Sequence, residues 1–366
     1  MLTAEQLDSF PDELITLFDS YQQSVLNDIA RRLLKVDMTS TAAWQMQRLL
    51  NAGAVYNNVL DELSRLTGKS EQELLRVFNK AGVKTLQFDN SIYTAAEFTP
   101  TKLQLSPQML DVLKSGYNRT AGLMKNLVAT TALSGQDAFL SAADLAYMQV
   151  STGAFSYTDA IRQAVKSVAE QGLKIINYAS GRKDQIDVAM RRAVLTGVSQ
   201  TAAELQLRHA EDMGVDLIQT SAHIGARPTH QVWQGKIFSR SGADKKYPDF
   251  VSSTGYGTAT GLCGINCRHS FYPFFPGISE NVYKNLQEYE GRSVNYNGKK
   301  LTFYEATQEQ RKIEREIRKA KRVAETLKNA GLEFSEEQKQ VRILQAKMRD
   351  FVAQTGLMRQ NVREQI

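Results

Sequence analysis

Apolar residues recur with a helical period along most of this chain, and the period is interrupted between about Gly214 and Tyr304. Side chains three and four positions apart lie on one face of a helix, so such a stripe predicts a helix packed against a core. An early stripe consists of Leu14, Leu17, Phe18, Tyr21, Val25, Ile29 and Leu33. The sequence therefore predicts an α+β chain that is mostly α, with helices before and after a small section of mixed structure.

Capping signals divide the helical regions into separate elements. Ser70–Glu73 has the form of a capping box, which predicts that a new helix begins there. Ser106–Pro107 supplies an N-cap and a first-turn proline, and Ser156–Asp159 caps a further helix. After a turn at Ser180–Gly181, another helix is expected over residues 184–213.

The interrupted section favours short strands. β-Branched and aromatic residues predict strands at residues 215–219, 236–239 and 271–275, and Pro273 suits an edge position in the last of these. Residues 294–303 are typical of a β-hairpin because Asn297 and Gly298 form a two-residue turn between alternating segments.

The chain returns to helix from Tyr304. Residues 311–319 alternate opposite charges, which supports a long exposed helix that Gly331 ends. Ser335–Gln338 forms a second capping box, and the helix that follows is expected to reach about Thr355. Two helices joined by a short loop predict an antiparallel hairpin.

These patterns predict three domains. They are a helical N-terminal region at 1–152, helices with the α+β section at 153–303, and the C-terminal helical hairpin at 304–366. No apolar run is long enough to cross a bilayer, and the N-terminus lacks the pattern of a secretory signal. The net charge of +6 is a modest excess that fits a polyanionic neighbour such as nucleic acid without requiring one.

The mixed section concentrates the residue types that bind metals. It holds both cysteines of the chain and three of its four histidines. Imidazole and thiolate are the ligands that zinc prefers. A tetrahedral set would consist of His230, Cys263, Cys267 and His269. The alternative is that the cysteines are small buried thiols and the histidines hydrogen-bond to loop carbonyl groups, so zinc is a candidate cofactor and not a required one.

A cysteine-nucleophile enzyme is a competing interpretation. Cys267, His269 and Asn266 are the residue types of such a site, but positions so close in the chain generally point apart. The chain has no nucleophile elbow, phosphate loop or dinucleotide fingerprint. Catalysis is therefore the less favoured interpretation.

Two further alternatives belong to other classes of protein. A metal-dependent hydrolase or nuclease would use His223, His230 and His269, with a carboxylate such as Asp249 as base. A DNA-binding module would use the basic residues of the C-terminal helices, and its binding would weaken steeply with salt.

Several ordered segments resemble one known family. Residues 221–235 (SAHIGARPTHQVWQG) are similar to the signature of the phage minor capsid protein 2 family. The other matching segments are GAFSY at 153–157, DAIR at 159–162, RRAV at 191–194, YPDF at 247–250, TGYG at 254–257 and GLCGINCRHSF at 261–271. The resemblance runs from the N-terminal helices to about Gly277 and thins beyond it.

The chain is more distantly similar to the Mu-type head morphogenesis proteins. Their shared core is an Arg-Pro-x-His segment leading to a glycine, followed by a closing Cys-Arg-Cys. The residues that match it here are Arg227, Pro228, His230, Gly235, Cys267 and Arg268. His269 stands where the last cysteine of that pattern would be, which exchanges one type of metal ligand for another.

The resemblance implies a low-copy structural protein of a phage or prophage head, and not an enzyme. Its expected partners are the portal protein and the major capsid protein, with non-specific DNA contact as a further candidate and no membrane or small-molecule substrate. It would lie in the virion, at the capsid interior or the portal vertex, after assembly in the host cytoplasm, and would aid head assembly and DNA passage. Residues expected to hold the mixed section together as a rigid knob are His223, Arg227, Trp233, Gly235, Asn266 and Arg268.

Overall fold

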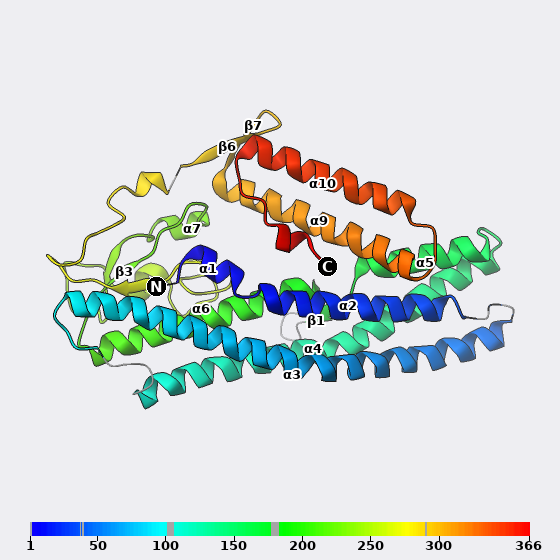
Figure 1. Ribbon diagram of the computed structural model, residues 1–366, viewed down its shortest axis with the longest axis horizontal. Helices are drawn as coiled ribbons and strands as arrows, with labels where there is room; N and C mark the ends of the chain where they lie inside the picture. Colours follow the sequence, from blue (N-terminus) through cyan, green and yellow to red (C-terminus); the bar gives the residue numbers. More distant parts are fainter. Residues whose placement is uncertain (1, 37, 39, 101–105, 177–182, 290) are drawn as a thin grey trace. The chain divides into compact units, whose positions relative to one another are not determined.

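The computed structural model describes residues 2–36, 38, 40–100, 106–176, 183–289 and 291–366 (Figure 1). These residues form two compact units. Unit 1 comprises Met1–Asp12, Glu71–Leu123 and Arg191–Gln308, and unit 2 comprises Glu13–Ser70, Met124–Met190 and Glu309–Ile366. Most of the chain is helical and its few strands are short, which confirms the predicted fold class. The turn expected at Ser180–Gly181 lies outside the described residues.

Unit 2 is built mainly from helices. Its elements are α2 (Asp12–Leu33), the first part of α3 (Thr41–Ala95), the second part of α4 (Pro107–Ser151), α5 (Tyr157–Gln171), β1 (Lys174–Ile176), β2 (Lys183–Gln185), α9 (Phe303–Asn329), α10 (Ser335–Thr355) and η3 (Asn361–Glu364). The apolar stripe of α2 is buried from Leu14 to Leu33, with Leu17 half-buried. Helix α5 begins as predicted, because the side chain of Ser156 accepts a hydrogen bond from the N–H of Asp159.

Helix α3 runs through the point where the sequence predicts a new helix, so the capping box at Ser70–Glu73 is a wrong prediction. Ser70 is buried, and its hydroxyl donates to the carbonyl oxygen of Thr67 inside the continuous helix. The apolar stripe also continues across this turn, with buried Leu66 before it and buried Leu74 after it. Burial on both sides of Ser70 therefore outweighs the local tendency to start a helix.

Helices α9 and α10 run antiparallel and side by side, as predicted (Figure 1). Gly331 follows α9 with a φ of 70°, a conformation that glycine adopts without strain. Ser335 is the first residue of α10, and the N-cap position before it is Phe334. The N–H of Ser335 donates to the Glu333 carboxylate at 2.7 Å. An ion pair of 3.4 Å between Lys347 and Glu316 links the two helices.

Unit 1 contains the mixed section and its small sheets. Its elements are α1 (Ala4–Ser9), the second part of α3, the first part of α4, α6 (Ile186–Asp212) except its first five residues, which belong to unit 2, β3 (Leu217–Thr220), α7 (Pro228–Gln231), β4 (Ile237–Ser239), α8 (Phe250–Thr254), β5 (Phe271–Pro273), η2 (Leu286–Glu288), β6 (Ser293–Tyr296) and β7 (Lys299–Thr302). Strand β3 lies between β4 and β5 and is antiparallel to both. Pro273 therefore lies on an edge strand, as predicted.

Reciprocal glycine contacts bring α4 and α6 close together within unit 1. A Cβ atom on Gly116 would lie 1.9 Å from Thr201 Oγ1, and a Cβ atom on Gly197 would lie 2.1 Å from Thr120 Oγ1. Only glycine leaves room for an approach this close. The packing thus fixes the position of α6, whose end leads into β3.

The predicted hairpin is confirmed in β6 and β7. Asn297 and Gly298 join the strands with φ values of 50° and 73°, the left-handed conformation that a tight two-residue turn requires. Among the residues that the structure describes, no helix is both long enough and apolar enough to span a bilayer.

Candidate metal centre

The three-stranded sheet brings two distant segments together at one end. Thr220 at the end of β3 pairs with Phe271 at the start of β5, and Gln219 pairs with Ile237 at the start of β4. The connection from β3 to β4 therefore meets the chain that enters β5. His230 lies on α7 in the first of these segments, and the second segment carries Cys267 and His269.

The loop before β5 depends on close backbone approaches. A Cβ atom on Gly261 would lie 2.0 Å from the carbonyl oxygen of Gly255, and one on Gly264 would lie 2.6 Å from the carbonyl oxygen of Thr258. Cys263 and Asn266 take φ values of 57° and 56°, which non-glycine residues seldom adopt. These positions turn the chain tightly enough to direct the Cys267 side chain inward.

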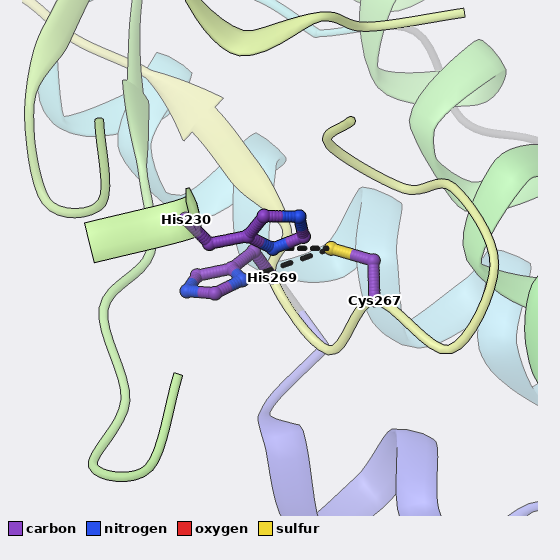
Figure 2. Close-up of side chains that lie close together, drawn as sticks. All are labelled: His230, Cys267 and His269. Carbon is purple, nitrogen blue, oxygen red and sulfur yellow. Dashed lines mark hydrogen bonds between the residues drawn. The ribbon is translucent and has the colours of Figure 1, made fainter. Parts of the chain in front are cut away.

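Three potential ligand atoms converge in this part of unit 1. The Cys267 Sγ atom lies 3.8 Å from His230 Nδ1 and 3.7 Å from His269 Nδ1, and one ligand atom from each residue falls within 4.8 Å of the others. Figure 2 shows both imidazole rings turned toward the sulfur atom. All three side chains are buried, with at most 2% of each residue exposed.

The outer nitrogens of both rings are held by oxygen atoms. His230 Nε2 lies 2.8 Å from the carbonyl oxygen of Thr260, and His269 Nε2 lies 3.2 Å from Gln234 Oε1. The backbone N–H of His223 also donates to Gln234 Oε1, which identifies that atom as the oxygen of the amide. Since both oxygens only accept, each Nε2 carries the proton of a neutral ring, and each Nδ1 faces the sulfur as a lone pair.

Aromatic rings enclose the cluster. Trp233 is 4% exposed, and its ring centroid lies 4.6 Å from that of His230 and 4.7 Å from that of His269. The ring of His223 lies against that of His269, with centroids 4.3 Å apart and ring planes tilted by 37°. Behind these rings lies an apolar core formed by Ala203, Ile218, Trp233, Phe238, Phe250, Leu262, Cys263, Cys267 and Phe271.

Burial dominates the protonation of these groups. It lowers the pKa of His230 and lowers the pKa of His269 well below the ordinary value, so both rings are neutral at pH 7. Burial raises the pKa of the Cys267 thiol, against the opposing effect of hydrogen bonds from the backbone N–H groups of His269 and Cys263. A thiol with a raised pKa is a poor nucleophile.

Cys263 is close to the cluster but is not part of it. Its thiol is buried and lies 3.6 Å from the carbonyl oxygen of His269. Burial also raises the pKa of this thiol. Of the four ligands predicted from the sequence, the structure therefore brings together His230, Cys267 and His269, and leaves Cys263 beside them.

The other signature residues make structural contacts. A guanidinium N–H of Arg227 donates to the carbonyl oxygen of Ile265 at 2.9 Å, which joins the two segments directly. Arg268 forms an ion pair of 2.6 Å with Asp8 near the end of α1. Gly235 has a φ of 68°, and a Cβ atom there would lie 2.6 Å from the Leu286 side chain.

Of the residues of the predicted hydrolase site, the three histidines lie close together, with ring centroids 4.3 Å apart for His223 and His269 and 5.4 Å apart for His230 and His269, whereas Asp249 has a different role. His223 Nδ1 faces the carbonyl oxygen of Ile224 at 3.1 Å, and a neutral ring must place its proton there. Asp249 caps α8, where its carboxylate accepts hydrogen bonds from the N–H and the hydroxyl of Ser252. These hydrogen bonds lower the pKa of Asp249, which makes the carboxylate a weaker base.

Sequence reasoning missed two residues that position this site. Gln234 contacts both His269 and the backbone of His223, yet nothing in its surroundings along the chain distinguishes it from a surface glutamine. Asp8 lies 260 positions from its partner Arg268, so no local pattern could reveal the pair. The only sequence signal was that Gln234 falls within the segment 221–235.

The chain is similar to a known protein family and to one relative over nearly its whole length. The family model described as phage minor capsid protein 2 matches residues 2–353. A protein named structural protein from Lactococcus phage LL-H is 26% identical over 359 residues, covering 93% of this chain and 93% of the relative. A second structural protein, from Lactococcus phage mv4, is 38% identical over 125 residues, covering 33% of this chain and 93% of that relative. No solved structure was found to match the chain.

Proposed function

The chain belongs to the phage minor capsid protein 2 family, and from this premise we propose that it is a low-copy head protein that binds the portal and the inner capsid surface. The observation that carries the proposal is the extent of the match, which includes residues of both units. The relative from phage LL-H, a structural protein by name, also aligns over 93% of each chain. In this role the protein would aid head assembly and the passage of DNA.

The arrangement of the candidate site favours a structural role over an enzymatic one. The reactive groups are enclosed: His230, Cys267 and His269 are buried, and the outer nitrogens of both rings are engaged by oxygen atoms. A hydrolytic metal site needs an exchangeable position and a positioned base. Asp249, the carboxylate considered for that purpose, is engaged in capping α8.

The C-terminal helices do not favour a dedicated DNA-binding module. Several of their cationic side chains are engaged within unit 2, where Arg318 pairs with Asp187 at 2.7 Å and Arg359 pairs with Glu364. The guanidinium of Arg322 is buried and donates to the carbonyl oxygen of Ala169. Cations held in this way are less available to neutralise phosphates.

Deletion of the gene in its phage or prophage tests the role in the head. We expect mass spectrometry of purified wild-type particles to detect the chain at a few copies relative to the major capsid protein. Particles from the deletion strain should be non-infectious or lack DNA, and plasmid-borne wild-type gene should restore them. Absence of the chain from purified particles, or normal infectivity without it, would contradict the proposal.

Co-expression with the portal protein of the same genome tests the proposed partner. We expect the two chains to co-elute in size-exclusion chromatography. A tail protein from the same genome serves as the control and should elute separately. Separate elution of the two chains would exclude the portal protein as a partner. The role in the head would then be tested by the deletion experiment alone.

A further inference from the structure

The buried cluster around Cys267 has too few protons to satisfy all of its hydrogen-bond acceptors, and the proposed role in the head does not explain this. A neutral imidazole carries one N–H, and in both His230 and His269 this group donates outward to an oxygen atom. The inner triad of His230 Nδ1, His269 Nδ1 and Cys267 Sγ therefore has two bare lone pairs and a single thiol proton. That proton can satisfy one nitrogen at a time, which leaves the other as a buried acceptor without a donor.

We propose that His230 Nδ1, Cys267 Sγ and His269 Nδ1 bind one Zn²⁺ ion, on which these three ligands leave one coordination position open. The ion takes the place of the thiol proton and satisfies all three atoms at once. In this step the S–H bond breaks, an S–Zn bond forms, and the proton leaves to solvent, so no oxidant or reductant is needed. Two imidazoles and a thiolate bind Zn²⁺ in preference to Mg²⁺ or Ca²⁺.

The spacing of the three atoms fits a tetrahedral ion. With Zn–S and Zn–N bonds of ordinary length, tetrahedral geometry places sulfur and nitrogen about 3.5 Å apart. The observed separations of 3.8 Å to His230 and 3.7 Å to His269 exceed this by only a few tenths of an ångström. Small side-chain movements are therefore enough for all three atoms to reach the ion.

The surroundings also match those of a bound ion. Metal-binding histidines usually donate their second N–H to an oxygen atom, which fixes the tautomer and the orientation of the ring. Thr260 and Gln234 supply those oxygens here.

The ion would add bonds to metal between two segments that hydrogen bonds already join. His230 and Cys267 are 37 positions apart. Their segments are also joined by Arg227, which donates to the carbonyl oxygen of Ile265, and by the contact between His269 and Gln234. A buried ion at this point cross-links the connection between β3 and β4 to the chain entering β5. It would therefore stabilise unit 1.

Elemental analysis of the full-length chain tests this inference directly. The protein should be purified without a polyhistidine tag or chelator and with a thiol reductant, so that bound zinc belongs to the chain. We expect about one zinc per chain. Folded wild-type protein that contains no zinc, and whose melting temperature is unchanged by added Zn²⁺, would overturn the proposal.

Matched variants assign the ligands. We expect Cys267→Ser and His269→Asn to lose stoichiometric zinc, with affinities reduced more than about 100-fold, since even outer-shell changes cost about 10–100-fold. His223→Asn is the control, because this ring lies against that of His269 but its Nδ1 faces Ile224. It should retain zinc. Equal loss in His223→Asn, or full retention in Cys267→Ser, would contradict the assignment.

A spectroscopic measurement covers the case in which a ligand variant fails to fold. The wild-type chain is loaded with Co²⁺, which should give the visible bands of a tetrahedral site and a thiolate-to-cobalt charge-transfer band. Absence of the charge-transfer band would exclude Cys267 as a ligand. These readouts use purified protein alone, so they can fail while the head assignment stands, and the deletion experiment can fail while they succeed.

Discussion

The signature segments of unit 1 and the helices of unit 2 reach a packed core by different means. In the segments 221–235 and 261–271, order depends on backbone atoms in close approach and on buried polar groups that are hydrogen-bonded within unit 1. In unit 2, helices pack through apolar stripes such as that of α2. Two glycines of this unit, Gly53 and Gly68, have no atom within 4 Å of an added Cβ. The first region should tolerate little change, and the second should tolerate much more.

The largest expected effect comes from Gly261→Ala in unit 1. The new Cβ would lie 2.0 Å from the carbonyl oxygen of Gly255, and both groups are backbone, so no side-chain rotation relieves the clash. We expect a loss of more than about 4 kcal/mol in the free energy of unfolding, or no folded unit 1 at all. Thermal denaturation and the yield of soluble protein measure this. A melting temperature equal to that of wild type would show that the loop is far more adaptable than its contacts indicate.

Trp233→Ala should have the next largest effect. The ring is buried and packs against both His230 and His269, so its removal leaves a cavity beside the proposed metal ligands. We expect a loss of about 3–5 kcal/mol, measured by denaturant titration. Trp44→Ala in unit 2 is the matched control, because that ring is 8% exposed and stacks on Tyr147 at the edge of its core. A greater loss in Trp44→Ala would reverse the proposed difference between the regions.

Buried carboxylates of the two regions should respond to pH in opposite directions. In unit 1, burial raises the pKa of Asp89 to about 7, although Gln206 donates to its oxygens. The folded state then holds a proton that the unfolded state releases above about pH 4, so stability falls as pH rises from about 4 to 7. In unit 2, hydrogen bonding from Lys166 and the nearby charge of Arg162 outweigh burial and lower the pKa of Glu337, so its stabilising contribution is lost as pH falls.

Asp89→Asn tests this contrast. The amide keeps an oxygen for Gln206 and removes the buried charge, so we expect the variant to gain roughly 2–4 kcal/mol at pH 8 and almost nothing at pH 4. Glu337→Gln should instead lose stability at pH 8, because Arg162 and Lys166 lose their charged partner. Calorimetric melting temperatures at both pH values measure the two effects. A gain in Asp89→Asn of the same size at both pH values would refute the raised pKa.

The helices could be predicted from sequence because their signals are local. The cap at Ser156 and the hairpin turn at Asn297–Gly298 each depend on a few neighbouring residues, and the structure confirms both. The wrong helix start at Ser70 shows the limit of such signals, since a capping box is overruled where the apolar stripe continues on both sides.

The candidate site could be predicted only in part. The residue types at His230, Cys267 and His269 were visible in the sequence, but their convergence depends on β3 lying between β4 and β5. No spacing along the chain specifies that order of strands. Cys263 lies outside the cluster although it is only four positions from Cys267, and Gln234 contacts His269 from 35 positions away, so neither could be predicted before the backbone was known.

The smallest expected effect is a gain in stability from Gly53→Ala in α3. No atom lies within 4 Å of the new Cβ, and alanine favours a helix and restricts the unfolded chain. We expect a gain of about 0.5–1 kcal/mol, seen as a small rise in melting temperature. The control is Gly257→Ala in unit 1, where space is equally open but φ is 88°, so alanine should cost about 1–2 kcal/mol. A loss in Gly53→Ala would mean that unit 2 is as intolerant of change as the signature segments, and the contrast between the regions would fail.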